Sequence, residues 1–388
     1  MGDQHERAAE TAGGGGGGAD TITRIEIRVC RGDSAPDDVR ASAALPGGTR
    51  PPFVVLTLET ADGVTGTSFA FSTFNPRAAG EAMVPIKRFF LGRDVFERER
   101  AQFDFRRFDR SWTLSPIYAY GPFDNASWDA IGKKTGRSVS RLLGRARDTV
   151  PVYVSSMFLP RGVDAYVEQA REARAAGFHG YKIHPGGRLD EDLAVYAAVR
   201  EEVGPDFALM VDPVGAYTYD EALTAGRALE RLGYRWFEEP VQDVDWLSQQ
   251  KLTAALDIPV VGTETLSGGH RGTSQAIAGR LVDAVRTDVS WRGGITDVMK
   301  TAALADAFGM RCELHTCVYH ALDLVNLQCV SALTNCTYLE LLYPLADNDF
   351  GLAHGIDITE GHASVPDEPG LGIAYDWDFI EDRTVAVL

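Results

Sequence analysis

Hydrophobic and polar positions alternate from Thr21 to about Phe71, through the stretches TITRIEIRVC, PFVVLTLET and, after a turn at ADG, VTGTSFAF. A period of two is typical of strands with one buried face, so this region predicts three strands with a hairpin. Apolar residues at helical spacing follow in AAGEAMVPIKRFFLG, VFERERAQFDFRRF and NASWDAIGKKTGRSVSRLLG, and the last stretch ends on a glycine typical of a helix C-terminus. Together these elements predict an α+β domain over residues 21–145.

The pattern changes after residue 146. Short apolar strands, from VPVYVS and GYKIH to TYLELL, alternate with amphipathic stretches such as VDAYVEQAREARAAGF. Strands that alternate with helices pair in parallel, and eight such units predict an α/β fold with a closed barrel over 146–344. A doubly wound open sheet is the alternative. The segment 345–388 lacks this rhythm, and we expect it to return to the first domain.

Composition narrows the class of protein. Residues 1–20 contain six consecutive glycines and no apolar run after a basic start, which predicts a disordered tail and no secretory signal. No apolar run approaches the roughly 20 residues of a membrane span. The net charge of −17 disfavours nucleic acid and anionic membranes as partners. Five cysteines without C-x-x-C spacing argue against a disulfide framework and a thiolate zinc site, so we expect a cytoplasmic protein.

Ionisable or polar residues stand near the predicted carboxyl end of every barrel strand, where barrel enzymes carry their active sites. They are Ser155, Ser156, Lys182, His184, Asp212, Glu238, Glu264, Asp288, His315 and Glu340. Among these, Asp212, Glu238 and Glu264 follow one another at intervals of 26 residues on successive strands. Three converging carboxylates would repel one another unless a cation lay between them. Oxygen ligands without thiolates favour Mg²⁺, with Mn²⁺ as the near alternative.

Candidate bases flank this predicted metal site. Lys182 and His184 come from the second barrel strand and His315 from the seventh, while Asp288 ends the sixth. We expect Asp288 to orient the His315 imidazole and to raise its basicity, as carboxylates do for catalytic histidines.

The chain resembles the enolase superfamily and, within it, the mandelate racemase group, which includes muconate lactonizing and acid-sugar dehydratase enzymes. The resemblance covers about residues 21–380 and rests on the NASWDAIGKKTGRSVSRLLG helix, YKIH, MVDP, FEEP, GTET, TDVSWRGGITDVMKTAALADAFGM, ELHT, YLE and GHASVPDEPGLG. It implies an α+β capping domain, formed by the N-terminal region and the C-terminal tail, over a modified TIM barrel of the (β/α)7β type.

The resemblance also assigns roles to residues. It implies that Asp212, Glu238 and Glu264 bind Mg²⁺, that Asp288 and His315 form the Asp/His dyad, and that Glu340 hydrogen-bonds the substrate carboxylate. His184 stands where the family usually carries the second lysine of K-x-K, so two interpretations stay open. It is either a second acid/base or a sign that the enzyme works through His315 alone.

These roles predict abstraction of the proton α to a carboxylate, with Mg²⁺, Lys182 and a protonated Glu340 stabilising the enediolate. We favour loss of water from a sugar acid to give a 2-keto-3-deoxy acid. Racemisation or epimerisation of a 2-hydroxy acid or an amino acid derivative is the alternative, and a non-catalytic binding protein is a third hypothesis. Ser156, Arg31 and Arg77 are candidate contacts to this small-molecule substrate, the two arginines in lid stretches of the capping domain. We also expect a homo-oligomer.

Overall fold

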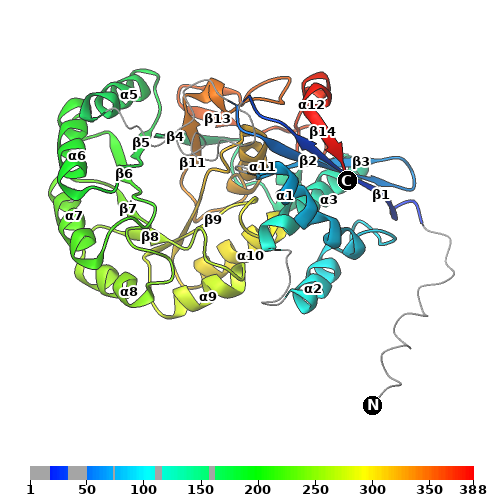
Figure 1. Cartoon of the computed structure of the whole chain (residues 1–388), viewed down its shortest axis with the longest axis horizontal. Coiled ribbons are helices and arrows are strands. Elements are labelled where there is room, and N and C mark those ends of the chain that lie inside the picture. The colour runs from blue at the N-terminus through cyan, green and yellow to red at the C-terminus, as the bar shows by residue number, and fades with distance from the viewer. Residues whose placement is uncertain (1–17, 34–49, 73–74, 110–115, 157–161) are drawn as a thin grey trace, which may run out of the picture.

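The computed structural model describes residues 18–33, 50–72, 75–109, 116–156 and 162–388 (Figure 1). Most of the predicted tail lies outside these ranges. Residues 18–20, which the prediction included in the tail, make defined contacts, because the Lys134 ammonium lies 3.2 Å from the Ala19 carbonyl oxygen and 3.0 Å from the Asp20 carboxylate.

The N-terminal region forms a capping domain around a four-stranded antiparallel sheet of order β14-β1-β2-β3. The three predicted strands and their hairpin are present. The buried face of the sheet packs on α3, and Leu56, Phe105 and Phe123 lie in this core. The elements are β1 (Ile22–Cys30), β2 (Phe53–Thr60), β3 (Thr65–Ala70), α1 (Pro76–Met83), the 3-10 helix η2 (Val84–Phe89), α2 (Arg98–Phe108), α3 (Ile117–Thr135), α4 (Val139–Leu143) and β14 (Thr384–Val387).

Eight parallel strands follow in the sequential spatial order β11-β4-β5-β6-β7-β8-β9-β10. They are β4 (Thr149–Ser156), β5 (Gly180–Ile183), β6 (Ala208–Val211), β7 (Trp236–Glu238), β8 (Val260–Gly262), β9 (Ala284–Thr287), β10 (Arg311–Leu314) and β11 (Leu339–Tyr343). This order has no reversal point, so the doubly wound alternative is wrong. Within the described ranges no ladder joins β10 to β11, but the Thr316 amide donates to Glu340 at 3.1 Å across this boundary.

Seven helices connect these strands, and α5 to α10 form an arc around them in Figure 1. They are α5 (Val163–Ala175), α6 (Leu189–Val203), α7 (Tyr219–Arg231), α8 (Trp246–Ala255), α9 (His270–Ala278), α10 (Gly294–Ala307) and α11 (His320–Val330). Among the described helices none is long and apolar enough to span a membrane.

The C-terminal tail divides between the two parts of the molecule. The short strands β12 (Ile358–Thr359) and β13 (His362–Ser364) form a hairpin, and β13 pairs antiparallel with β4 of the barrel. The end of the tail, α12 (Trp377–Arg383) and β14, lies at the capping domain, where β14 pairs with β1. Phe350 and Tyr375, earlier in the tail, also pack on Phe69 of β3. The tail therefore contacts both parts of the molecule, and its assignment to the capping domain stays a prediction.

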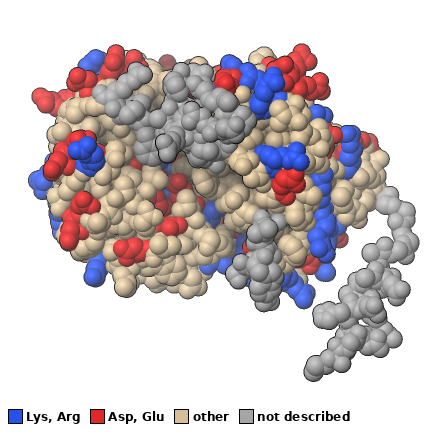
Figure 2. Space-filling model, viewed as in Figure 1, with Lys and Arg blue, Asp and Glu red and all other residues tan. Residues whose placement is uncertain are grey.

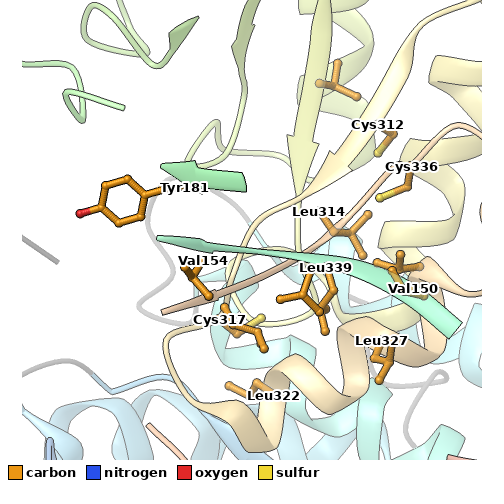
Figure 3. Packing of buried hydrophobic residues seen from close by; sticks show 14 of the residues in the cluster. Val150, Val154, Tyr181, Cys312, Leu314, Cys317, Leu322, Leu327, Cys336 and Leu339 are labelled. Atoms are coloured by element: carbon orange, nitrogen blue, oxygen red, sulfur yellow. The ribbon is translucent and has the colours of Figure 1, made fainter. Parts of the chain in front are cut away.

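The barrel strands pack on α11 through apolar side chains. Figure 3 shows Val150, Leu314 and Leu339 beside Leu322 and Leu327 of that helix. All five cysteines are free and buried, and burial raises the pKa of the Cys312 and Cys317 thiols well above the usual range. These thiols therefore stay protonated, and the Cys317 thiol donates to Asp288 Oδ1 at 3.6 Å.

The capping domain is joined to the barrel through the beginning of α10. Asp124 of α3 accepts a hydrogen bond from the Thr296 amide at 2.8 Å, and Asn125 accepts one from the Ile295 amide at 3.1 Å. These amides belong to the first turn of α10 and have no partner within the helix. The contact fixes α3 against the segment that follows Asp288.

Candidate active site

The predicted site residues lie close to the carboxyl ends of their strands. Asp212, Asp288 and His315 come directly after β6, β9 and β10, and Glu238 is the last residue of β7. Glu340 is different, because it is the second residue of β11 and pairs in register with Tyr153 of β4. It therefore lies deeper than the strand end that the sequence analysis assigned to it.

Three carboxylates meet at this end of the barrel. Asp212, Glu238 and Glu264 are buried, and each offers an oxygen within 4.8 Å of the others. Burial, together with the neighbouring carboxylates, raises the pKa of Glu264 to about 8, although His315 opposes this. Its buried Oε2 atom has no hydrogen-bond partner within the described part of the chain. This set of crowded oxygens, one of them unsatisfied, fits a hard divalent cation.

Figure 2 shows the face of the molecule seen in Figure 1, and acidic atoms are visible in a hollow near its centre. Basic and acidic side chains are interspersed over the rest of this face. A hollow with carboxylates at its base can admit a small anionic substrate only if a cation compensates their charge.

One side of the acidic cluster is occupied by the dyad. The Asp288 Oδ2 atom lies 3.3 Å from His315 Nδ1, and His315 Nε2 lies 3.4 Å from Glu264 Oε1. Burial alone would lower the pKa of His315, but the carboxylates of Glu264 and Asp288 outweigh it and raise the pKa above its usual value. The arrangement gives the basic imidazole that the sequence analysis expected.

His184 lies on the other side of the cluster. Its Nε2 atom is 3.2 Å from Asp212 Oδ2, and its Nδ1 atom is 2.5 Å from the carbonyl oxygen of Ser156. The His184 amide donates to the Ser156 hydroxyl at 2.9 Å. Ser156 thus holds His184 in place, and its direct contact with substrate stays a prediction.

Lys182 lies beneath these groups in a network of ion pairs. Its Nζ atom is 2.8 Å from Glu238, 2.7 Å from Glu340 and 3.4 Å from Asp212. Burial opposes its charge, but these carboxylates raise the pKa of Lys182 above its usual range. Burial would likewise raise the pKa of Glu340, but Lys182 and Arg286 lower it well below its usual range. These two cations thus favour the carboxylate form of Glu340, which differs from the expected protonated form; protonation of Glu340 in the reacting enzyme stays a prediction.

Comparison with known proteins agrees with this arrangement. A family profile described as the enolase C-terminal domain-like family matches residues 165–379, which is more than half of the chain. A second, the mandelate racemase/muconate lactonizing enzyme N-terminal domain, matches residues 38–144. The chain belongs to the mandelate racemase/muconate lactonizing enzyme family.

Similar members of the family include a sugar-lactone cycloisomerase and two sugar-acid dehydratases. The chain is 32% identical over 345 residues to the D-galactarolactone cycloisomerase of Agrobacterium fabrum, covering 85% of this chain and 90% of that protein. It is 35% identical over 260 residues to the arabinonate dehydratase of Saccharolobus solfataricus, covering 64% and 67%. The crystal structure of D-glucarate dehydratase from Agrobacterium tumefaciens complexed with magnesium superposes with a TM-score of 0.85 at 34% identity, covering 95% and 100%.

The prediction of an enolase-superfamily enzyme with a capping domain and a barrel is confirmed by these matches.

The site of this family member also contains two residues that the sequence did not predict. Glu239 accepts a hydrogen bond from the Glu264 amide at 2.9 Å, and burial beside Asp212 and Glu238 raises its pKa to about 8. Arg286 contacts Glu238 at 2.9 Å. Arg286 lies within a strand, where a search of strand ends does not find it.

Strained backbone marks the same region. Val214, Glu239, Thr263 and Val318 have positive φ angles of 52°, 38°, 83° and 68°, and each lies within three residues of a predicted site residue. Such conformations are costly for residues with a β-carbon, above all for β-branched ones, and they concentrate at functional sites.

The two candidate arginines of the capping domain lie elsewhere. Arg31 pairs with Asp382 at 3.2 Å with 53% of its side chain exposed, and Arg77 pairs with Glu81 at 2.8 Å with 60% exposed. In the described part of the chain neither guanidinium contacts the triad or the dyad. Most of the lid stretch after Arg31, and residues 73–74 of the other, lie outside the described residues. Substrate contact by these arginines stays a prediction.

Proposed function

We propose that this enzyme removes the α-proton of a sugar acid in a Mg²⁺-dependent reaction and then eliminates water from the β-carbon to give a 2-keto-3-deoxy acid. The observation that carries this proposal is that two imidazoles contact different carboxylates of the triad and come from strands on either side of the triad strands in the sheet order. His315 faces Glu264 at 3.4 Å, and His184 faces Asp212 at 3.2 Å. A substrate held at the triad would therefore have an acid/base group on each side.

The metal would be held by Asp212, Glu238 and Glu264, whose oxygens converge. When bound, Mg²⁺ supplies the positive charge that stabilises the oxygens of the enediolate. The relative from Agrobacterium tumefaciens was crystallised with magnesium, which supports this choice of ion. The ammonium of Lys182, fully buried at the base of the cluster, adds a second positive charge for the substrate carboxylate.

The chain's own residues would move the protons. His315, oriented by Asp288, takes the α-proton onto Nε2, and the electron pair of that C–H bond forms the enediolate. The enediolate then expels the β-hydroxyl, which leaves as water after it takes a proton from His184 or from the His315 imidazolium. The resulting enol becomes the 2-keto acid by tautomerisation. Atoms balance, because the substrate loses one molecule of water.

Racemisation or epimerisation is the second candidate, since an acid/base group on each side can also return the proton to the opposite face of the same carbon. The 29% identity over 276 residues to the N-succinyl-L-Arg/Lys racemase of Bacillus cereus supports this candidate. A non-catalytic binding protein is the least favoured hypothesis, because every proposed metal ligand and both dyad residues are present. The homo-oligomer and the cytoplasmic location stay predictions.

Incubation with Mg²⁺ and a library of sugar acids tests the proposal. Formation of a 2-keto acid, measured with a carbonyl reagent, is the expected result. Solvent deuterium at the α-carbon of recovered or inverted substrate, without 2-keto acid, would instead support epimerisation. If no acid in a broad library reacts or exchanges, the proposed function is wrong.

A further inference from the structure

The guanidinium of Arg286 lies among the charged groups of the site. Arg286 is the third residue of β9, two positions before Asp288, and its side chain is fully buried. Its Nε atom is 2.9 Å from Glu238 Oε1, and its Nη2 atom binds Glu340 Oε2. One side chain therefore joins a proposed metal ligand to the acid of the last barrel strand.

Lys182 completes this arrangement from the opposite side. It binds the same Glu238 oxygen at 2.8 Å and the other oxygen of Glu340 at 2.7 Å. Two cations and two carboxylates thus alternate in a closed ring, and all four side chains are 0% exposed. Buried charges are tolerated only when they are paired, and this ring pairs each charge twice. Lys182 donates a hydrogen bond to Glu238 and Arg286 donates one to Glu340, whereas Lys182–Glu340 and Arg286–Glu238 are ion pairs without hydrogen-bond geometry among the described residues.

The remaining amino group of the guanidinium, Nη1, contacts β10, the strand that precedes the proposed base His315. Arg286 Nη1 donates to the carbonyl oxygens of Glu313 at 3.3 Å and Leu314 at 3.1 Å. These are the last two residues of β10, and His315 comes next. The same guanidinium therefore fixes the position of β10, and with it His315, along the barrel axis relative to Glu238 and Glu340.

We propose that Arg286 is a positioning residue, whose planar guanidinium holds the metal ligand Glu238, the acid Glu340 and the strand of His315 in one arrangement. This inference rests on the function proposed above. Arg286 acts through its partners, because it is fully buried beneath them. Shape matters more than charge in this role, since a lysine supplies one flexible ammonium where the guanidinium supplies a fixed fork of donors.

The variant Arg286→Lys separates a role of the guanidinium shape from a role of its positive charge. Lysine keeps the charge but lacks the fixed fork of hydrogen-bond donors. Mg²⁺ affinity is measured by isothermal titration calorimetry on the full chain without substrate, and thermal unfolding of the metal-free protein is measured beside it. We expect Mg²⁺ to bind about 10-fold or more weakly, as is typical when a residue that orients a ligand is replaced. On a substrate found in the library, kcat should fall more than KM changes.

Arg200→Lys is the matched control. Arg200 is also a largely buried arginine that donates to backbone carbonyls, among them Phe207 at 2.8 Å and Leu232 at 2.8 Å, before and after β6 and away from the acidic cluster. Its replacement should leave Mg²⁺ affinity unchanged.

Wild-type Mg²⁺ affinity and turnover in Arg286→Lys would overturn the proposal. If that variant does not fold, the double variant Arg286→Gln with Glu340→Gln removes one cation and one anion, and it should also bind Mg²⁺ at least about 10-fold more weakly. Wild-type affinity in the double variant would equally overturn it. A wild-type protein that binds Mg²⁺ but turns over no acid would contradict the proposed function. The Mg²⁺ titrations of the variants would still test whether Arg286 positions the metal ligand.

Discussion

Asp288 divides its two carboxylate oxygens between His315 and its own loop. Oδ2 lies 3.3 Å from His315 Nδ1, whereas Oδ1 accepts hydrogen bonds from the Ser290 amide at 2.6 Å and the Trp291 amide at 2.7 Å. The loop contacts fix the carboxylate, and the fixed carboxylate orients the imidazole. His315 Nε2 is thereby directed at the triad, where an α-proton would have to be removed.

Replacing His315 with Asn should remove this base while leaving the metal ligands in place. We expect exchange of the α-proton with solvent deuterium, followed by NMR on an acid from the library, to fall by about 10²–10⁴-fold. Mg²⁺ binding, measured by calorimetry, should persist. Retained exchange would remove the dyad from the mechanism.

Replacing His184 with Gln tests whether the enzyme uses one base or two. If His184 protonates the departing hydroxyl, turnover to 2-keto acid should fall by about 10²-fold or more while α-proton exchange through His315 continues. Equal loss of both would show that His184 takes part in proton abstraction, and full turnover would show that His315 works alone. His179→Gln is the control, since His179 precedes the same strand at its opposite end.

Replacing Glu264 with Gln should separate metal binding from folding. The Glu264 carboxylate is buried with an unsatisfied oxygen, so the metal-free variant should be at least as stable as the metal-free wild type. Mg²⁺ at 100 times its Kd should raise the free energy of unfolding of the wild type by about 2.7 kcal/mol and that of the variant by much less. Urea unfolding with and without Mg²⁺ measures both. Equal Mg²⁺ stabilisation would exclude Glu264 as a ligand, and the exposed Glu368→Gln serves as control.

His320 should make the fold sensitive to acid. Burial lowers the pKa of His320 from 6.5 to about 4, so below pH 6.5 the unfolded chain takes up a proton that the folded chain does not. Stability is therefore lost as the pH falls from 6.5 towards 4, and the loss from this group reaches about 3 kcal/mol at pH 4. Urea unfolding between pH 7 and pH 4 should show a smaller loss in His320→Gln than in the wild type.

The exposed His354 provides the comparison for that series. His354→Gln should follow the wild-type pH dependence, because it removes an exposed histidine and leaves the buried His320 in place. If His320→Gln also follows the wild type, burial of His320 is not a source of acid sensitivity.

The sequence by itself determined the two-part fold and the groups that meet at the barrel mouth. Alternating and helical periods decide which segments become strands and helices, and parallel strands bring their carboxyl ends to one edge. The regular spacing of Asp212, Glu238 and Glu264 then sufficed to predict that they converge, as they do within 4.8 Å.

Tertiary structure alone decided the depth and charge state of the groups beneath that mouth. The position of Glu340 inside β11, its ionisation by Lys182 and Arg286, and the closed ring with Glu238 depend on the relative heights of neighbouring strands. A local pattern of polar and apolar residues carries no information about those heights. The pairing of β13 with the beginning of β4 and of β14 with β1 likewise depends on which backbone groups the neighbouring strands leave unpaired in the folded chain.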